Sequence, residues 1–133
     1  RKISLVNGGE QRRSFTWIGD GIEGLMAIIE NKNKKADGEI FNIGNPANNH
    51  SVKELAELLI DEAKKFPKFR EAAEATELDI IPASAYYGKS YDDMQNRVPS
   101  IKKMESRLGW QPETGMREML YKTIAWYAEN EAK

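Results

Sequence analysis

The sequence predicts a mixed α and β fold, and two observations carry this prediction. Apolar residues recur at helical spacing in four segments, and short runs rich in β-branched and aromatic residues lie between those segments. The chain has 133 residues, a length at which about 70% of the surface exposed by the unfolded form is buried on folding. We therefore expect a single domain with its own core over residues 1–133.

The first predicted helix runs from Gly19 to Asn31. Its apolar residues share one face: Ile22, Leu25, Met26 and Ile29. Because they follow the i, i+3, i+4, i+7 spacing, we expect a helix here that packs against another element. Asp20 suits the positive end of the helix dipole, and the cations of Asn31–Lys35 suit the negative end and form a solvated turn.

Two further helices are predicted by their start and stop signals. Ser51 and Glu54 have the spacing of a capping box, which begins a helix that ends before Pro67. A short helix lies within Pro99–Gly109, and its final glycine suits a left-handed C-terminal cap. The faces expected to be buried carry Leu55, Ala56, Leu59 and Ala63 in the first helix, and Ile101, Met104 and Leu108 in the second.

A last helix is expected from about Thr114, and short strands are expected between the helices. The stripe of the last helix consists of Met116, Met119, Leu120, Thr123, Ile124 and Tyr127. The predicted strands are Ser4–Val6, Arg13–Ile18, Glu39–Ile43 and Leu78–Ile81. The polar segment Lys64–Glu77 fits either a helix or an irregular excursion.

Composition and charge exclude several classes of protein. The 20 Lys and Arg residues are balanced by 21 Asp and Glu for a net charge of -1, which argues against a protein that binds nucleic acid or anionic membranes through bulk electrostatics. The chain has no cysteine, so disulfides, thiolate zinc sites and a cysteine nucleophile are excluded. No apolar run approaches the roughly 20 residues of a membrane helix. Arg1–Ser4 lacks the apolar stretch of a signal peptide, so we expect a cytoplasmic protein.

Side chains for independent catalysis are scarce. His50 is the sole histidine and precedes a predicted helix cap, so we interpret it as a solvated loop residue rather than a catalytic one. With one histidine and no cysteine, a metal site would need mainly carboxylates, and no Asp/Glu spacing resembles a calcium loop. We therefore predict no metal.

Asn7–Arg13 is the first segment with a chemical signal. Asn7–Gly9 lies between two strand-like runs and is typical of a hairpin turn, because Asn and Gly accept positive φ at little cost. Strand alternation sends Arg12 and Arg13 to opposite faces. Arginines beside a glycine turn suit a phosphate or diphosphate, since guanidinium is a bidentate donor and glycine leaves backbone N–H groups approachable. A diphosphate site and a pair of surface cations both stay open.

Ser84–Arg97 is the second such segment. It is rich in aromatic and ionisable residues and lies between a predicted strand and a predicted helix, which is typical of binding loops and also of ordinary surface loops. Tyr86 and Lys89 are spaced Y-x-x-K and so lack the Y-x-x-x-K spacing of a catalytic tyrosine–lysine couple.

Five motifs follow one another along nearly the whole chain: Arg13-Ser14-Phe15-Thr16, Asp20-Gly21-Ile22, Phe41-Asn42-Ile43-Gly44-Asn45, Ser51-Val52-Lys53-Glu54-Leu55 and Leu108-Gly109-Trp110-Gln111-Pro112. In this order they resemble the C-terminal third of extended short-chain dehydrogenase/reductases that act on nucleotide sugars, the NAD-dependent epimerase/dehydratase family. Gly8–Arg13, Ser84–Tyr91 and Arg97–Ile101 are most similar to the UDP-glucuronate decarboxylase domain of bifunctional polymyxin-resistance proteins of the ArnA type.

The resemblance implies an α/β protein of which this chain is the C-terminal, substrate-binding portion. The parent would bind NAD in an N-terminal Rossmann domain absent from this chain, and UDP-glucuronate between that domain and this one. It would oxidise C4 of the sugar and then release CO2 to give a UDP-4-keto-pentose, used in lipid A modification with aminoarabinose.

Two motifs of the parent enzymes, G-x-x-G-x-x-G and Y-x-x-x-K, occur nowhere in this chain. We therefore expect the chain alone to bind no NAD and to be inactive. The first residue is not Met, which fits a piece of a longer protein. Without the remaining domain we expect exposed apolar surface and self-association into a homo-oligomer.

The resemblance also implies which residues form the site. Arg97 would be the catalytic residue at the reacting sugar, where a fixed cation can orient the carboxylate or stabilise the developing enolate. Tyr91 would contact the substrate. The nucleotide end would be cradled by Asn7, Gly8, Gly9, Gln11, Arg12 and Arg13, with Arg13 on the diphosphate.

Some positions depart from the pattern of these relatives. Trp17 and Gly19 stand where relatives carry an acid and an arginine, and Ser4 stands where a lysine opens the substrate-binding strand. These departures leave the exact substrate open more than the fold. Two alternatives stay open: another nucleotide-sugar epimerase or dehydratase, and a free-standing, non-catalytic sugar-nucleotide-binding module, which the short chain and the missing Y-x-x-x-K couple favour.

Overall fold

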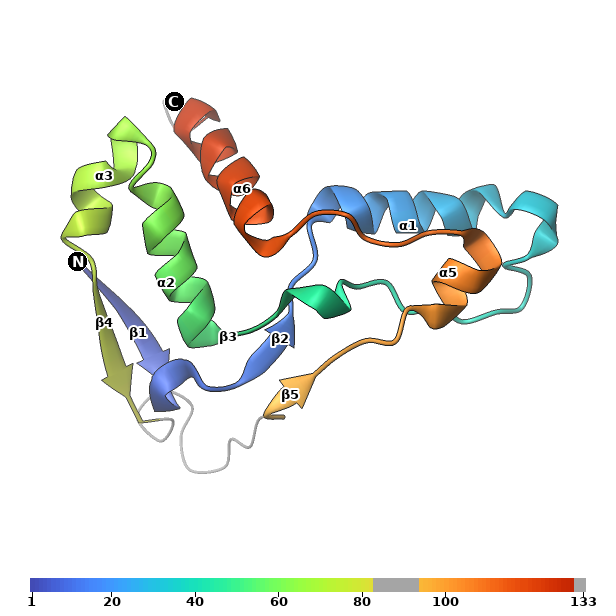
Figure 1. Cartoon of the computed structure of the whole chain (residues 1–133), viewed down its shortest axis with the longest axis horizontal. Helices are drawn as coiled ribbons and strands as arrows, with labels where there is room; N and C mark the ends of the chain where they lie inside the picture. The colour runs from blue at the N-terminus through green and yellow to red at the C-terminus, as the bar shows by residue number, and fades with distance from the viewer. Residues whose placement is uncertain (83–93, 131–133) are drawn as a thin grey trace. The chain divides into compact units, whose positions relative to one another are not determined.

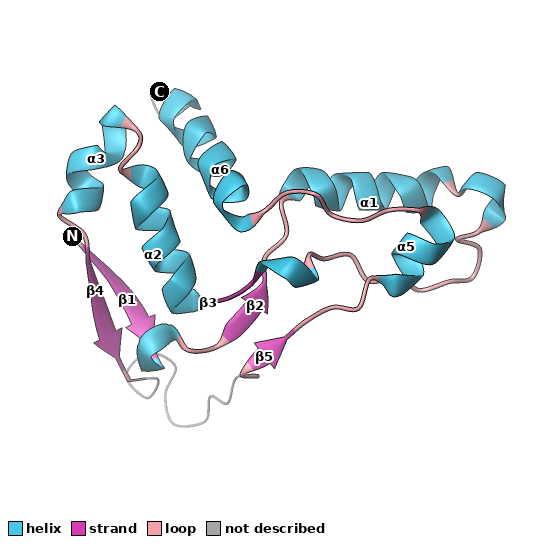
Figure 2. Ribbon diagram, in the orientation of Figure 1, coloured by secondary structure: helices cyan, strands magenta, loops and turns pink. Residues whose placement is uncertain are grey.

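The computed structural model of the chain describes residues 1–82 and 94–130 and divides into two compact units. Unit 1 comprises Arg1–Arg12, His50–Asn96 and Arg117–Lys133, and unit 2 comprises Arg13–Asn49 and Arg97–Met116. Helices and short strands follow one another along the chain, which confirms the mixed α and β class (Figures 1 and 2).

The helices are α1 (Ile18–Glu30), α2 (Val52–Ala63), α3 (Pro67–Glu74), α5 (Lys102–Leu108) and α6 (Met116–Asn130). The strands are β1 (Lys2–Val6), β2 (Arg12–Ser14), β3 (Asn49–Ser51), β4 (Glu77–Ile81) and β5 (Asn96–Arg97). Short 3₁₀ turns η1 (Asn7–Gly9), η2 (Lys32–Lys34) and η3 (Pro46–Asn48) connect some of them. Every predicted helix is therefore present, and the open segment after α2 contains the helix α3.

Unit 1 pairs β1 with β4 and adds α2, α3 and most of α6. The two strands run parallel and side by side, with Lys2 opposite Glu77 and Val6 opposite Ile81 (Figure 1). The buried apolar residues of this unit are Leu5, Ala56, Ala73, Leu120 and Ile124. They come from the faces of β1, α2 and α6 that the apolar periodicity marks, and from α3.

The hairpin expected around Asn7–Gly9 is wrong. The turn chemistry itself is present, because Asn7, Gly8 and Gly9 have φ values of 49°, 77° and 69°. The two flanking strands do not pair with each other, however: β1 pairs with β4, and β2 lies between β3 and β5. The residue types of a turn determine how the chain bends there, but they do not determine which strands pair with each other.

The three-stranded sheet has the order β3-β2-β5. The chain passes from one unit to the other within each of these strands. The strand expected over Arg13–Ile18 ends at Ser14, and the Phe15 N–H then donates to the Asn48 carbonyl at 3.1 Å before α1 begins.

Unit 2 is built around Ile101, Met104 and Trp110. Ala27 and Ile28 of α1 pack against this cluster, together with Phe41, Ile43 and Leu108. Gly24 permits the contact, because a Cβ at this position would lie 3.0 Å from Trp110 Cε2.

The first helix packs against another element, as expected, but not through its apolar stripe. Ile22, Leu25, Met26 and Ile29 are exposed, with exposed fractions from 45% to 72%. The packed face of α1 is instead the one that carries Gly24, Ala27 and Ile28, because small residues let the helix approach the Trp110 ring.

No strand forms over the predicted Glu39–Ile43 run. Phe41 and Ile43 pack against the core cluster of unit 2, whereas Ile40 is exposed. Asn42 Nδ2 donates to the Ser100 carbonyl at 3.3 Å. Alternation of apolar and polar residues shows that the two sides of a segment have different surroundings, but it does not supply a strand partner. Among the described residues this run has none.

Candidate functional site

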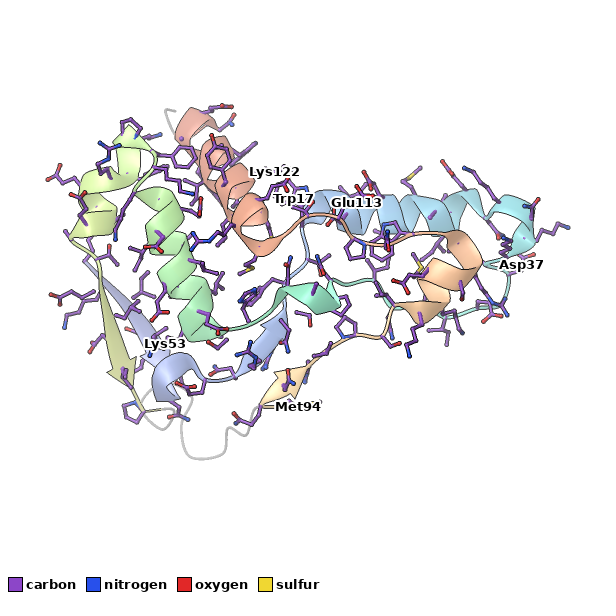
Figure 3. The ribbon with its side chains drawn as sticks, in the orientation of Figure 1. Trp17, Asp37, Lys53, Met94, Glu113 and Lys122 are labelled. Carbon is purple, nitrogen blue, oxygen red and sulfur yellow. The ribbon has the colours of Figure 1, made fainter. Side chains whose placement is uncertain are left out.

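In unit 1 the predicted nucleotide cradle lies along the N-terminus of α2. The Val52 N–H donates to the Gln11 carbonyl at 3.1 Å. Gly9 is buried, and a Cβ there would lie 2.9 Å from the backbone nitrogen of Lys53, which Figure 3 labels near the start of α2. A side chain at position 9 would therefore force the turn and the helix apart.

Arg12 lies beside the carboxylate that caps α2. Its Nη1 is 3.2 Å from Glu54 Oε2, and the two side chains are 40% and 44% exposed. Both hydrogen bonds of the predicted capping box are present: the Ser51 N–H donates to Glu54 Oε2 at 2.7 Å, and the Glu54 N–H donates to Ser51 Oγ at 3.0 Å. Arg12 is thus held at the end of the cradle by an ion pair with Glu54, which no motif in the sequence predicts.

His50 joins the same cluster. It lies on β3 with a side chain 29% exposed, and its Nδ1 is 3.6 Å from Glu54 Oε2. The interpretation of His50 as a solvated loop residue is therefore wrong. The i, i+4 spacing of His50 and Glu54 is the signal that could have found this pair.

The electrostatics of this cluster keep Glu54 ionised. The hydrogen bond from the Ser51 backbone lowers the pKa of Glu54 below its ordinary value, and the charges of Arg12 and His50 act in the same direction. The cluster therefore holds an anion among donors and cations at the point where β2 begins.

In unit 2 the candidate residues are Arg13 and Arg97. Arg13 is half-buried on β2, and its neighbour Ser14 donates from Oγ to the Arg97 carbonyl at 3.2 Å. Arg97 is exposed on β5. The structure thus brings the backbone of Arg97 beside the strand that carries Arg13, whereas Tyr91 lies outside the described residues.

A buried polar network in unit 2 explains other motif residues. Asp20 accepts two hydrogen bonds from Thr114, from its N–H at 3.0 Å and from its Oγ1 at 2.8 Å. Asn45 and Asn48 donate from Nδ2 to the Thr114 carbonyl at 3.1 and 3.0 Å. All four residues are buried, so their role is to hold the start of α1 in place rather than to touch a ligand.

The glycine turn after β1 leads into β2 and not into a helix, so it does not fit the pyrophosphate of NAD. Within residues 1–82 and 94–130, no three His, Asp or Glu side chains gather as a metal site would require. No described helix combines the length and apolar character needed to cross a membrane.

Solved structures show the same fold. PbgP3 from Burkholderia pseudomallei is 39% identical with a TM-score of 0.85, and the match covers 99% of this chain and 36% of that protein. A UDP-glucose 4-epimerase from Thermotoga maritima, solved with UDP-glucose, is 21% identical with a TM-score of 0.73, over 98% of this chain and 36% of the epimerase. A dTDP-glucose 4,6-dehydratase from Bacillus anthracis, solved in complex with NAD, is 22% identical with a TM-score of 0.69, over 98% of this chain and 36% of the dehydratase.

The fold is therefore that of the C-terminal portion of epimerases and dehydratases of the short-chain dehydrogenase/reductase type. The family model described as GDP-mannose 4,6 dehydratase matches residues 1–123, and the chain belongs to this family. It is homologous to nucleotide-sugar dehydratases and epimerases, and it spans 36% of the length of each of these three solved proteins.

Proposed function

We propose that this chain is the substrate-binding portion of an NAD-dependent UDP-glucuronate decarboxylase of the ArnA type. The observation that carries the proposal is the hydrogen bond from Ser14 to the Arg97 carbonyl, which sets an exposed arginine beside the strand of Arg13. One cation would hold the diphosphate and the other would meet the carboxylate of the sugar. Neutral nucleotide sugars offer no such carboxylate.

At the nucleotide end, this chain would supply arginines and backbone N–H groups. Arg13 is the proposed partner of the diphosphate, because a guanidinium offers two parallel donors to phosphate oxygens. Arg12 stands next to it at the start of β2. Asn7, Gly8, Gly9 and Gln11 would complete the cradle, since glycine lets a ligand approach the backbone closely.

At the sugar end, Arg97 would act when the C4-oxidised sugar loses CO2. In that step the C5–C6 bond breaks, its electron pair moves onto the C4 oxygen as an enolate, CO2 leaves, and C5 then takes up a proton. A fixed guanidinium stabilises the negative charge that develops on the oxygen. NAD, which would supply the preceding C4 oxidation, is proposed to bind a part of the parent protein outside this chain.

Replacing Arg97 with Ala in the protein encoded by the native reading frame tests the proposal. We expect CO2 release from UDP-glucuronate to fall by about 100-fold or more, as for loss of one charge-stabilising group in a transition state. UDP-glucuronate binding should change far less. Release of CO2 and NADH formation are followed together with product mass.

Lys102→Ala is the matched control, because it removes an exposed cation of unit 2 that has no proposed role. Unchanged CO2 release in the Arg97 variant would refute the role of Arg97. A wild-type product of unaltered mass and altered stereochemistry would replace the decarboxylase with an epimerase.

A further inference from the structure

Three nitrogen atoms converge on one oxygen of Glu54 in unit 1. Glu54 Oε2 lies 2.7 Å from the Ser51 backbone nitrogen, 3.2 Å from Arg12 Nη1 and 3.6 Å from His50 Nδ1. The charged groups that act on this carboxylate are Arg12 from β2 and His50 from β3. Glu54 therefore interacts both with a proposed ligand-binding arginine and with a titratable side chain.

The charge of this group depends on the proton of His50. With a neutral imidazole, Arg12 and Glu54 cancel and the group carries no net charge. With an imidazolium, the group carries one positive charge, and the carboxylate divides its attraction between two cations. An anion approaching Arg12 is then attracted more strongly. Because the three side chains are 29% to 44% exposed, solvent limits the size of the effect.

We propose that Glu54 and His50 set the affinity of Arg12 for the diphosphate of a nucleotide sugar. Glu54 competes with the ligand for the guanidinium, and a proton on His50 relieves that competition. This inference rests on the proposed function, because it requires Arg12 to contact the nucleotide sugar.

Three variants separate the charges from the structural role of the helix cap. Glu54→Gln removes the negative charge but keeps an amide that can accept the Ser51 N–H, since glutamine also occurs at this capping position. His50→Gln removes the titratable group. Ser51→Ala removes the hydroxyl that accepts the Glu54 N–H and leaves Arg12, His50 and Glu54 unchanged, so it serves as the matched control.

The experiment is calorimetric titration of UDP-glucuronate into the protein encoded by the native reading frame, at constant ionic strength, from about pH 5.5 to about pH 8, where histidines exchange a proton. The diphosphate diester and the carboxylate of this ligand do not titrate in that range. We expect the wild-type Kd to be about three-fold lower at the acidic end, the size that exposed ion pairs give.

The variants should differ in both level and slope. His50→Gln should bind at every pH with the weaker affinity that the wild type shows at about pH 8. Glu54→Gln should bind at every pH with the tighter affinity that the wild type shows at about pH 5.5. Ser51→Ala should unfold at lower denaturant concentration yet keep the wild-type pH profile.

Two results would overturn the inference, and they are distinguishable. If the wild type binds UDP-glucuronate and both His50→Gln and Glu54→Gln keep its pH profile, the role of these two residues is rejected and the proposed function stands. Absence of UDP-glucuronate binding by the folded wild type at every pH rejects the proposed function and the inference with it.

Discussion

Single residues of the shared motifs have different roles in this molecule. Asp20 and Asn45 form buried hydrogen bonds around Thr114, and Trp110 belongs to the core of unit 2. Arg97 is exposed on a short strand and takes part in the fold through its backbone carbonyl. Motif membership therefore does not separate residues that keep the fold from residues proposed to meet a ligand, whereas burial and hydrogen bonding do.

Gly9 allows a direct test of the cradle at the scale of one residue. Gly9→Ala should destabilise the protein by about 2 kcal/mol or more, because φ is positive and the new Cβ would lie 2.9 Å from the Lys53 nitrogen. Gly38→Ala is the matched control, since φ there is also positive but no atom lies within 4 Å of the Cβ position. Urea unfolding measures both, and equal losses would show that the close approach to α2 is unimportant.

At the scale of elements, a buried carboxylate joins two helices of unit 1. Glu62 of α2 has a side chain 1% exposed and binds Arg117 Nη1 of α6 at 2.8 Å and Lys65 Nζ at 2.6 Å. Burial by itself would raise the pKa of Glu62, but these two hydrogen bonds outweigh it, and the pKa lies below the ordinary value. The pair therefore stabilises the contact of α2 with α6 while Glu62 is ionised.

Glu62→Ala should lower the free energy of unfolding by about 2 kcal/mol at neutral pH, less than a fully buried pair would give because both cations remain over half exposed. Since the folded-state pKa is lowered, this contribution is complete above the ordinary carboxyl pKa and is lost as pH falls through the folded-state value. Urea midpoints measured from neutral pH into the acid range check both statements. Glu57→Ala, an exposed change on the same helix, should have little effect. A stability difference that stays constant far into the acid range would contradict this account.

At the scale of the whole molecule, the chain leaves a large apolar stripe uncovered within unit 2. Ile22, Leu25, Met26 and Ile29 lie exposed on α1, and the chain spans 36% of the length of PbgP3. Contiguous exposed apolar surface favours association. We therefore expect the 133-residue chain to self-associate in solution.

Replacing Leu25 and Ile29 together with Ser should weaken that association by at least about ten-fold, since each side chain contributes apolar burial at a contact. Sedimentation velocity across a concentration series measures the dissociation constant. Ile40→Ser removes an apolar side chain that is 84% exposed and lies outside the stripe, so it should have no effect. Equal association of the double variant and the wild type would assign the contact to another surface.

Much of the element plan could be predicted from the sequence, because its signals are local. The capping box of Ser51 and Glu54 is present with both hydrogen bonds, Gly109 ends α5 with a φ of 68°, and positive φ occurs at Asn7–Gly9, whose residue types accept it at little cost. The family also follows from motif order, and the match over residues 1–123 confirms it. Arg12, Arg13 and Arg97 as ligand contacts stay predictions.

The tertiary structure decided the relations between distant segments. It paired β1 with β4 instead of β2, turned the stripe of α1 outward because Gly24 admits the Trp110 ring, and set Arg12 and His50 on the oxygen of Glu54. Periodicity and turn chemistry depend on neighbours within a few residues, so short stretches of the sequence are enough to predict them. Strand partners, the choice between two faces of a helix and the meeting of charges depend on which distant surfaces fit together, and only the folded chain determines that fit.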